Sequence, residues 1–284
     1  MSATWNPDQP GDPVTIGPVG WLLVALRGTA LALLVFGGLA LLLLVRLIER
    51  PLCGLHRPVT PYITQIVCRN AFRILGMGFR SSGALMAEHG AVVANHSSWL
   101  DIFALNARKR IYFVSKSEVA AWPGIGWLAR ATGTVFIERD PRRARDQAAL
   151  FEARLAAGHK LLFFPEGTST DGLRVLPFKT TLFAAFFTKP LREETSIQPV
   201  TVIYHAPQGA PARFYGWWGD MDFGPHLLKV LAAWPQGAVE VIYHAPLAVR
   251  DFTDRKDLAR SCEKAVRSAF AKGTGMSAEA DTCA

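Results

Sequence analysis

The hydrophobic residues of this chain are concentrated near its N-terminus. Residues 21–45 are almost entirely apolar and carry one charge, on Arg27. A run of this length is long enough to cross a bilayer as a single helix. Gly28, Gly37 and Gly38 leave a second interpretation open, in which two short helices form a re-entrant hairpin within one leaflet. Both interpretations predict a membrane anchor.

The segments on either side of this run indicate its orientation. Residues 1–20 are rich in proline and glycine and contain no lysine or arginine, a composition typical of a disordered N-terminus. The absence of a basic stretch before the run argues against a cleaved signal peptide. Basic residues follow the run and acidic residues precede it. The positive-inside rule therefore places the rest of the chain on the cytoplasmic side of the inner membrane.

Residues 62–75 extend this anchor. They carry apolar residues at helical spacing, with Arg69 and Arg73 among them. A helix in the lipid interface and a plain buried helix fit this pattern equally well. We assign residues 21–80 to a membrane-anchoring helical segment.

Beyond residue 80, short apolar runs alternate with segments of helical periodicity. Strands are predicted at residues 91–94, 110–115, 134–137, 160–164, 197–204 and 238–244. Helices are predicted at residues 99–105, 125–131 and 142–157. The alternation predicts an α/β fold with a mostly parallel central sheet flanked by helices, in a catalytic domain over residues 81–272. A flexible tail is predicted over residues 273–284.

One short sequence, Val-Ile-Tyr-His-Ala-Pro, occurs twice, at residues 202–207 and 241–246. Six residues are too few for a repeat architecture. The echo therefore predicts only two similar strands that end at similar turns.

Polar and charged groups directly follow four of the predicted strands. They are His96, Lys116, Arg139 and the loop at residues 165–172. The carboxyl ends of parallel strands meet at one edge of a sheet, where the functional groups of α/β proteins gather. We therefore expect these four features along one edge.

His96 and Asp101 lie five positions apart at a predicted strand-to-helix corner. On an unbroken helix this spacing turns two side chains about 140° apart, so they meet only if His96 precedes the helix and Asp101 lies in its first turns. Ser97 and Ser98 suit such a helix start. A carboxylate behind an imidazole fixes its tautomer and leaves the other nitrogen free to take a proton from a hydroxyl or thiol. A hydrogen-bonded corner histidine beside a solvated aspartate fits these ten residues as well.

The composition narrows the class of partner. Half of the residues are hydrophobic, the mean hydropathy is +0.18 and the formal net charge is +8. A membrane contact is indicated, together with an anionic lipid surface, an acidic carrier protein or a phosphate-bearing substrate. No zinc-finger, helix-turn-helix or RNA-binding pattern occurs, which disfavours nucleic acid. The four cysteines show no CxxC spacing, which disfavours a metal site and a disulfide scaffold.

The candidate groups fit direct acyl transfer. No serine or cysteine lies in a GxSxG elbow, so a covalent acyl-enzyme is not suggested. In a direct transfer His96 deprotonates an acceptor hydroxyl, and cationic or backbone donors stabilise the oxyanion at a thioester carbonyl.

Four motifs in this region resemble the glycerolipid acyltransferase family, whose familiar members are the lysophosphatidic acid acyltransferases. The matching segments are NHSSWLD at residues 95–101, GTVFIER at 133–139, FPEGT at 164–168 and IQPV at 197–200. Their order and spacing agree along this whole stretch, and four motifs together are far more specific than any one of them.

The resemblance implies a lysolipid acceptor and an acyl-ACP or acyl-CoA co-substrate, with no further cofactor, at a cytoplasmic membrane surface. By position it implies that His96 is the general base, Asp101 its partner and Lys116 a donor to the oxyanion. The residues that the resemblance assigns to acceptor binding are Arg139, Glu166, Gly167, Thr168 and Ser169.

The third motif departs from the family pattern at one position. The lysophosphatidic acid enzymes usually have the sequence FPEGTRS, whereas Ser169 stands at the arginine position here. A bidentate guanidinium is the best ligand for a phosphate monoester, so the case for that acceptor is weaker, although Arg174 or Arg142 could substitute. The segments at residues 116–123 and 167–172 are similar to the subgroup that acylates the hydroxyl of lyso-aminolipids such as lyso-ornithine lipid.

Several functions fit these features. O-acyl transfer to a lyso-aminolipid is favoured, and acylation of lysophosphatidic acid is the alternative. A thioesterase, in which water replaces the acceptor, and a non-catalytic lipid-surface binding protein are less favoured, because a binding protein does not need His96 as a base. Trp217 and Trp218 fit an acceptor pocket or, more readily, a position in the lipid interface.

Overall fold

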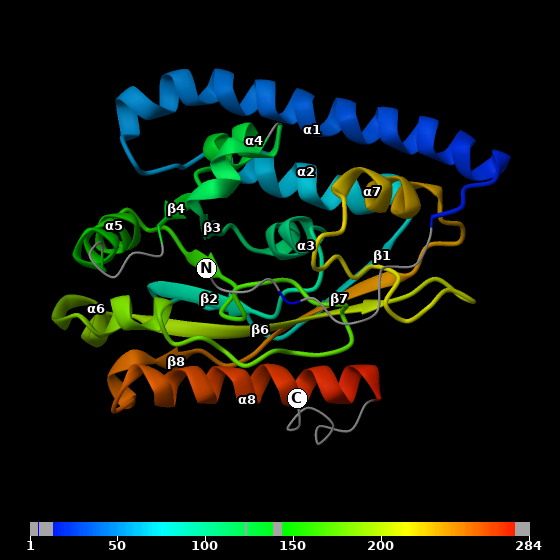
Figure 1. Ribbon diagram of the computed structural model, residues 1–284. Coiled ribbons are helices and arrows are strands. Elements are labelled where there is room, and N and C mark those ends of the chain that lie inside the picture. Colours follow the sequence, from blue (N-terminus) through cyan, green and yellow to red (C-terminus); the bar gives the residue numbers. More distant parts are fainter. Residues whose placement is uncertain (1–4, 6–13, 123, 139–143, 276–284) are drawn as a thin grey trace.

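The computed structural model describes residues 5, 14–122, 124–138 and 144–275 of the 284-residue chain (Figure 1). Several sequence predictions fall wholly or partly outside these residues. They are the disordered N-terminus over 1–20, the acceptor-binding Arg139, the substitute Arg142 and the flexible tail over 273–284. These stay predictions.

A single eight-stranded sheet forms the centre of the described fold. Its strands are β1 (Gly78–Ser82), β2 (Gly90–Ala94), β3 (Tyr112–Lys116), β4 (Val135–Ile137), β5 (Leu161–Phe163), β6 (Ser196–His205), β7 (Ala238–Tyr243) and β8 (Leu247–Ala248). The order across the sheet is β1-β7-β6-β2-β5-β3-β4, with β8 beside β6. Only the β6–β7 and β6–β8 pairs are antiparallel. The prediction of a mostly parallel sheet is confirmed.

The sequence pattern misses β1 and β8. β1 has the sequence Gly-Phe-Arg-Ser-Ser, and exposed residues alternate with half-buried ones along it, while β8 has only two residues. Neither strand is apolar enough for its hydrophobic pattern to reveal it. Because β1 pairs with β7, residues 78–80 belong to the sheet.

The repeated Val-Ile-Tyr-His-Ala-Pro sequence marks two strands that pair with each other. β6 and β7 run antiparallel, with Val202 opposite Val241. His205 therefore lies at the carboxyl edge of the parallel strands, whereas His244 follows β7 and donates its N–H to the carbonyl oxygen of Pro199 within β6. The prediction of two similar strands is confirmed. The repeated sequence does not place its two histidines in equivalent positions.

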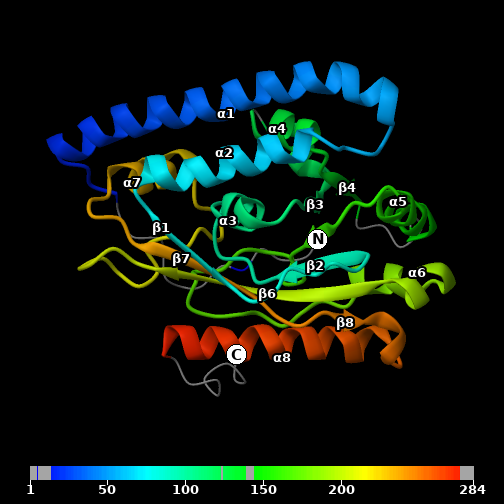
Figure 2. The same ribbon diagram turned by 180° about the vertical axis from the view of Figure 1, so that it is seen from behind.

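Helices cover both faces of the sheet (Figures 1 and 2). They are α1 (Pro18–Cys53), α2 (Thr60–Leu75), α3 (Asp101–Arg108), α4 (Ile125–Thr132), α5 (Ala144–Ala156), α6 (Lys189–Glu194), α7 (Phe223–Ala232) and α8 (Arg255–Thr274). Val92 and Ala94 of β2 pack into the core beneath α2, α3 and α7, whereas Ala91 and Val93 pack into the core over α5 and α8. The twofold period of a strand thus fills two separate cores.

α1 is the outermost helix and lies lengthwise along the rest of the fold. Its 36 residues extend about 54 Å at 1.5 Å per residue. Near its start Gly20 lies beside Ala232 of α7, and in its middle Gly38 lies beside Val67 of α2. The helix is continuous through Gly28, Gly37 and Gly38. The break expected for a re-entrant hairpin of two short helices is therefore absent from α1. The chain turns at residues 54–59 instead, and α2 runs back along α1 (Figure 1).

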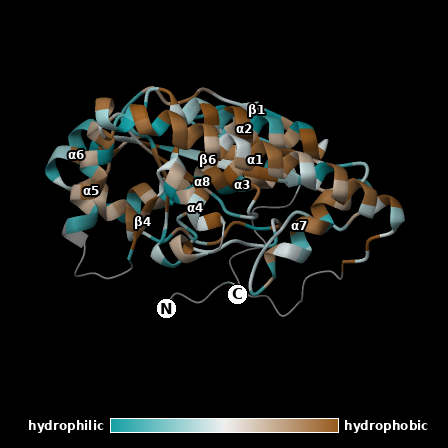
Figure 3. Ribbon diagram, turned by 90° about the horizontal axis from the view of Figure 1, so that it is seen from above, coloured by the Kyte–Doolittle hydropathy of each residue, from teal (hydrophilic) through white to brown (hydrophobic). Residues whose placement is uncertain are grey.

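The side of α1 that faces away from the sheet is apolar. Its exposed hydrophobic side chains are Val19, Trp21, Leu22, Leu26, Leu33, Phe36, Leu41, Leu43, Leu44, Leu47, Ile48 and Leu52. Figure 3, which looks down on this layer, shows hydrophobic residues along the helix. By length and composition α1 also qualifies as a membrane span. An exposed apolar surface of this size is typical of contact with lipid.

Arg27, the one charge in the apolar run, is buried against α7. Its guanidinium donates to the carbonyl oxygens of Leu231 (2.9 Å) and Ala233 (2.7 Å) at the end of that helix. These carbonyls have no partner within the helix, so the guanidinium caps them. Burial lowers the pKa of Arg27 from its usual value.

Replacing Arg27 with methionine should lower the free energy of unfolding by about 1–2 kcal/mol, because the buried carbonyl group of Leu231 loses its donor and that of Ala233 keeps only Gln236, while most of the packing is kept. Urea unfolding of the detergent-solubilised protein, followed by tryptophan fluorescence, measures this change. Arg250→Met, at an exposed arginine, is the matched control. Equal unfolding curves for the two variants would contradict the capping role.

Candidate active site

The corner that carries His96 is fixed by the residue before it. β2 ends at Ala94, and the side chain of Asn95 donates from Nδ2 to the carbonyl oxygen of Val202 and accepts from its N–H, both at 2.8 Å. Asn95 therefore continues the β2–β6 pairing with its side chain. The main chain of the next residue is free to turn away, and His96 leaves the sheet at its carboxyl edge.

His96 and Asp101 meet as the spacing predicts. His96 Nδ1 lies 2.6 Å from Asp101 Oδ2, and α3 begins at Asp101, two residues later than the sequence suggests. The main-chain N–H groups of Ser97 and Ser98 also donate to Oδ2, at 2.9 and 3.1 Å. The hydroxyl of Tyr204 donates to Oδ1 at 2.6 Å. Asp101 is fully buried, and four donors satisfy it.

This arrangement fixes the chemistry of the imidazole. With Asp101 accepting at Nδ1, the neutral ring carries its proton there and Nε2 keeps its lone pair. The ring stacks on Phe164 with centroids 4.0 Å apart and planes 11° apart, which holds its orientation. One fifth of the His96 side chain stays exposed. A substrate hydroxyl can therefore reach an oriented base.

Glu166 supports this corner from inside. It is buried, and its Oε1 accepts from the N–H of His96 at 2.6 Å while its Oε2 accepts from the N–H of Leu176 at 2.7 Å. Burial raises the pKa of Glu166 to about 8 and outweighs the two amide hydrogen bonds, which lower it. Its predicted contact with the acceptor stays a prediction, and the geometry shows a carboxyl group that ties residues 165–176, the Glu166 loop, to the histidine.

The other predicted site residues follow their strands at the same edge. Lys116 is the last residue of β3, which β5 separates from β2. In the Glu166 loop, Gly167 has a φ of 75°, a conformation that glycine adopts without strain. Thr168 Oγ1 accepts from the main-chain N–H of Trp5 at 3.3 Å, and Ser169 is half-buried beside it. Arg139 lies outside the described residues.

Sequence patterns alone do not point to Tyr204 as a neighbour of this site. Tyr204 is 103 positions from Asp101 and lies in a strand whose first nine residues are all buried, so no local signal marks it. The main-chain N–H of Trp217 donates to the carbonyl oxygen of Ser97 at 2.9 Å, and Trp218 is buried. The interfacial position favoured for the two tryptophans is therefore wrong for Trp218.

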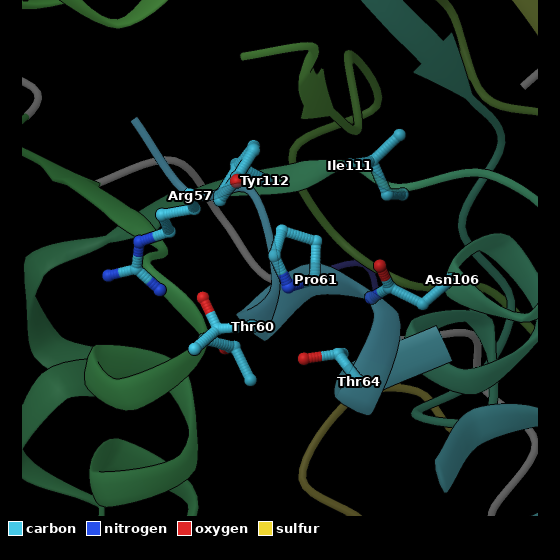
Figure 4. Close-up of a pocket in the computed structure, with 8 residues that line it drawn as sticks. Arg57, Thr60, Pro61, Thr64, Asn106, Ile111 and Tyr112 are labelled. Atoms are coloured by element: carbon cyan, nitrogen blue, oxygen red, sulfur yellow. The ribbon is translucent and has the colours of Figure 1, made fainter. Parts of the chain in front are cut away.

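A cleft of about 410 Å³ adjoins the site. Tyr204, His205, Gly172 and Leu173 line it, together with small residues of the 206–212 loop and the end of α8. A second recess lies between Arg57, Thr60, Thr64, Asn106 and Tyr112 and is drawn in Figure 4. It holds about 10 Å³, the space of one water molecule, and no predicted site residue lines it. The larger cleft has room for part of a substrate.

In the part of the chain that the structure describes, no group of three or more histidine, cysteine, aspartate or glutamate side chains is placed to hold a metal ion. The fold and the site together define a class of protein. It is an α/β enzyme in which a buried aspartate orients a histidine base at the carboxyl edge of the sheet, beneath a long helix with an apolar outer surface.

Comparison with known proteins identifies the family. Residues 79–203 match the family described as Acyltransferase. The chain is 62% identical over 266 residues to the lyso-ornithine lipid O-acyltransferase of Rhodobacter capsulatus, which covers 93% of this chain and 96% of that protein. It is 45% identical to the 1-acyl-sn-glycerol-3-phosphate acyltransferase of Neisseria gonorrhoeae over 94 residues, 32% of this chain and 36% of that protein.

The fold is also similar to that of a solved structure. The 1-acyl-sn-glycerophosphate (LPA) acyltransferase of Thermotoga maritima aligns with a TM-score of 0.65 at 20% identity, over 91% of this chain and 97% of that chain. The chain therefore belongs to the acyltransferase family, and the protein is an acyltransferase. The resemblance that the four motifs carry is confirmed.

The raised pKa of Glu166 predicts a pH-dependent stability. Between the ordinary value of 4.5 and the folded value of about 8, the folded protein keeps a proton that the unfolded chain releases. The free energy of unfolding should therefore fall as pH rises through this window, by at most about 1.4 kcal/mol per pH unit from this group. Urea unfolding at pH 5, 6.5 and 8 measures the slope.

Glu166→Gln keeps the shape of the side chain but cannot titrate, so its stability should change less over the same pH range. Asp251→Asn, at an exposed carboxylate, is the control and should keep the wild-type slope. A Glu166→Gln slope equal to that of the wild type would show that another group causes the dependence.

Proposed function

We propose that this enzyme transfers a fatty acyl group from an acyl thioester to the free hydroxyl of a lyso-aminolipid, with lyso-ornithine lipid as the acceptor. The oriented His96–Asp101 pair supports the reaction. The observation that carries the acceptor is the relative from Rhodobacter capsulatus, which shares 62% identity along nearly the whole chain.

The mechanism follows from the free nitrogen of His96. Nε2 takes the proton of the acceptor hydroxyl as its oxygen attacks the thioester carbonyl. The tetrahedral intermediate collapses, the carbon–sulfur bond breaks, and the leaving thiolate recovers the proton from His96. An ester and a free thiol result. Asp101 stabilises the imidazolium between the two proton transfers, and Lys116 is our candidate to stabilise the oxyanion.

The donor that we propose is acyl-ACP or acyl-CoA, used as a co-substrate and with no other cofactor. Both present the acyl group as a thioester and both are anionic. The net charge of +8 favours their approach to the protein surface.

Lysophosphatidic acid is the alternative acceptor. Its support is narrower, because the relative from Neisseria gonorrhoeae with that activity in its name covers 32% of this chain, and Ser169 replaces the arginine that suits a phosphate. A thioesterase needs only water at His96 Nε2. Acyl thioester loss without a lysolipid would favour that activity.

The protein associates with membranes through α1, and we propose that this helix lies in one leaflet instead of crossing the bilayer. Its first and middle parts contact α7 and α2 of the same body, and its last turns hold the start of α2 through Glu49. Trp5, which precedes the helix, contacts Thr168. A spanning helix would put one of its ends on the far side of the membrane. The cytoplasmic face of the inner membrane is our proposed location.

His96→Ala should reduce acyl transfer at least about 100-fold, because the general base is removed. Radiolabelled acyl-ACP or acyl-CoA and lyso-ornithine lipid in mixed micelles give the rate, and flotation with lipid vesicles shows whether membrane binding is kept. His89→Ala, at an exposed histidine near the opposite edge of the sheet, should keep the wild-type rate. Normal turnover by His96→Ala would end this mechanism.

The acceptor is tested by offering lyso-ornithine lipid and lysophosphatidic acid side by side to the wild-type enzyme. We expect a kcat/KM at least about tenfold higher for lyso-ornithine lipid, because the relatives that span the chain carry that acceptor in their names. Mass spectrometry of the lipid products measures both rates in one mixture. Turnover of lysophosphatidic acid alone would replace our acceptor with the alternative.

The position of α1 is tested by cysteine labelling. In a variant without its native cysteines, Thr15→Cys and Arg250→Cys introduce exposed thiols before the helix and in the catalytic domain. An impermeant maleimide should label neither thiol in intact cells stripped of their outer layers, and both after the membrane is permeabilised. Labelling of residue 15 alone in intact cells would show that α1 spans the membrane.

A further inference from the structure

An ion pair within the Glu166 loop is not used by the reaction chemistry. Arg174 lies beside Asp171, with its Nε 3.3 Å from Oδ1 and one terminal nitrogen 3.1 Å from Oδ2. Asp171 is buried and also accepts from the N–H of Leu173 at 3.1 Å. About two fifths of the Arg174 side chain is exposed. The pair thus offers one fixed carboxylate and one guanidinium with open donor positions.

The main chain holds this pair against the catalytic corner. The N–H of Thr170 donates to the carbonyl oxygen of His96 at 2.9 Å. The hydroxyl of Thr170 donates to the main-chain carbonyl oxygen of Arg174 at 3.3 Å. Gly172 packs on Ser97. One short loop therefore connects the residue that carries the general base to the ion pair.

Two tryptophans hold the guanidinium in place. Cζ of Arg174 lies 5.2 Å from the ring centroid of Trp5, which packs edge-to-face on Trp218 at 6.5 Å. Arg213 lies over the other tryptophan, with Cζ 5.9 Å from the ring of Trp218. Two packed indoles thus lie between two guanidinium groups, and cation–π attraction favours each of the two outer contacts. Trp5 orients Arg174 from the N-terminal segment.

The loop also has open space beside it. Gly172 and Leu173, which lie between Asp171 and Arg174, line the 410 Å³ cleft. This volume is large enough for an amino-acid headgroup, which occupies a fraction of a drug-sized pocket of about 300–1,000 Å³.

We propose that Arg174 and Asp171 are the headgroup site of this enzyme and bind an amino-acid headgroup that carries one carboxylate and one ammonium group. The carboxylate pairs with the exposed donors of Arg174, and the ammonium pairs with Asp171. This assignment rests on the proposed function, since it names how the same site recognises its acceptor. Arg174 and Asp171 thereby determine acceptor specificity, and Trp5 is a positioning residue.

The charges of the pair decide between two kinds of headgroup. Arg174 and Asp171 sum to zero, as do the carboxylate and ammonium of an ornithine headgroup. A phosphate monoester carries up to two negative charges and no positive one, so the fixed carboxylate of Asp171 repels it. Ser169 stands at the family's arginine position, so Arg174 is the one arginine of the Glu166 loop. Its positive charge is already paired with the carboxylate of Asp171.

The experiment is a double cycle of enzyme and substrate changes with the full-length protein. Wild type and Arg174→Gln are assayed with lyso-ornithine lipid and with its carboxyl methyl ester. Either change alone should raise the acceptor KM roughly 10- to 100-fold, the loss of one charged hydrogen bond. Both together should add little more, because the two groups act on each other. The kcat and the donor KM should stay near their wild-type values.

A purely structural ion pair would give a different result. Arg174→Gln would then lower kcat or unfold the protein, and methylation would raise KM by the same factor in wild type and variant. That result overturns the proposal. Arg174→Lys should recover part of the acceptor affinity. Arg260→Gln, which removes the arginine of an exposed pair with the same i, i+3 spacing to Asp257, should leave every constant unchanged.

A second cycle tests the ammonium partner. Asp171→Asn is paired with a lyso-ornithine lipid acetylated on its side-chain amine, and the same lack of additivity in KM is expected. Additive losses would remove Asp171 from the site.

These cycles separate the headgroup site from the proposed function. If the wild type acylates lyso-ornithine lipid but accepts the methyl ester equally well, the headgroup site fails and the function stands. If the wild type acylates only lysophosphatidic acid, the proposed function fails first.

Discussion

The buried carboxylate of Asp101 constrains the whole site. A carboxylate removed from water is costly unless its oxygens are fully hydrogen-bonded, and Asp101 finds its donors on two separate parts of the fold. His96, Ser97 and Ser98 belong to the corner after β2, Tyr204 lies near the end of β6, and the acid itself begins α3. The base is therefore oriented only when the corner, the helix and the sheet are all in place.

Contacts between residues close together in the sequence can be predicted from it, whereas contacts between distant segments cannot. The meeting of His96 and Asp101 can be predicted because both belong to one tight corner, and the edge position of Lys116 follows from the apolar run before it. Tyr204 could not be predicted, since the eight residues before it on β6 are all buried and no period marks the direction of its side chain. The inward direction of Glu166 is equally hidden, because no local pattern distinguishes a loop carboxylate that faces solvent from one that holds two amides.

The two buried charged residues of α1 are also explained by contacts with distant parts of the chain. Arg27 and Glu49 are both buried in a helix whose outer surface is apolar. Arg27 caps the carbonyl end of α7, and Glu49 accepts from the N–H groups of Val59 and Thr60 at the start of α2. Each charge satisfies the free end of another helix. Composition describes α1 as a membrane span, whereas these contacts make it the outer layer of the catalytic body.

The contact between Trp5 and Thr168 also has a consequence for biosynthesis. The two residues are 163 positions apart, so when the ribosome has made α1 the binding place of Trp5 has not yet been synthesised. Trp5 can therefore reach Thr168 only after much of the catalytic domain has been made. If α1 lies in one leaflet, as we propose, Trp5 stays on the side of the membrane where its partner loop later folds and reaches that loop without crossing the bilayer.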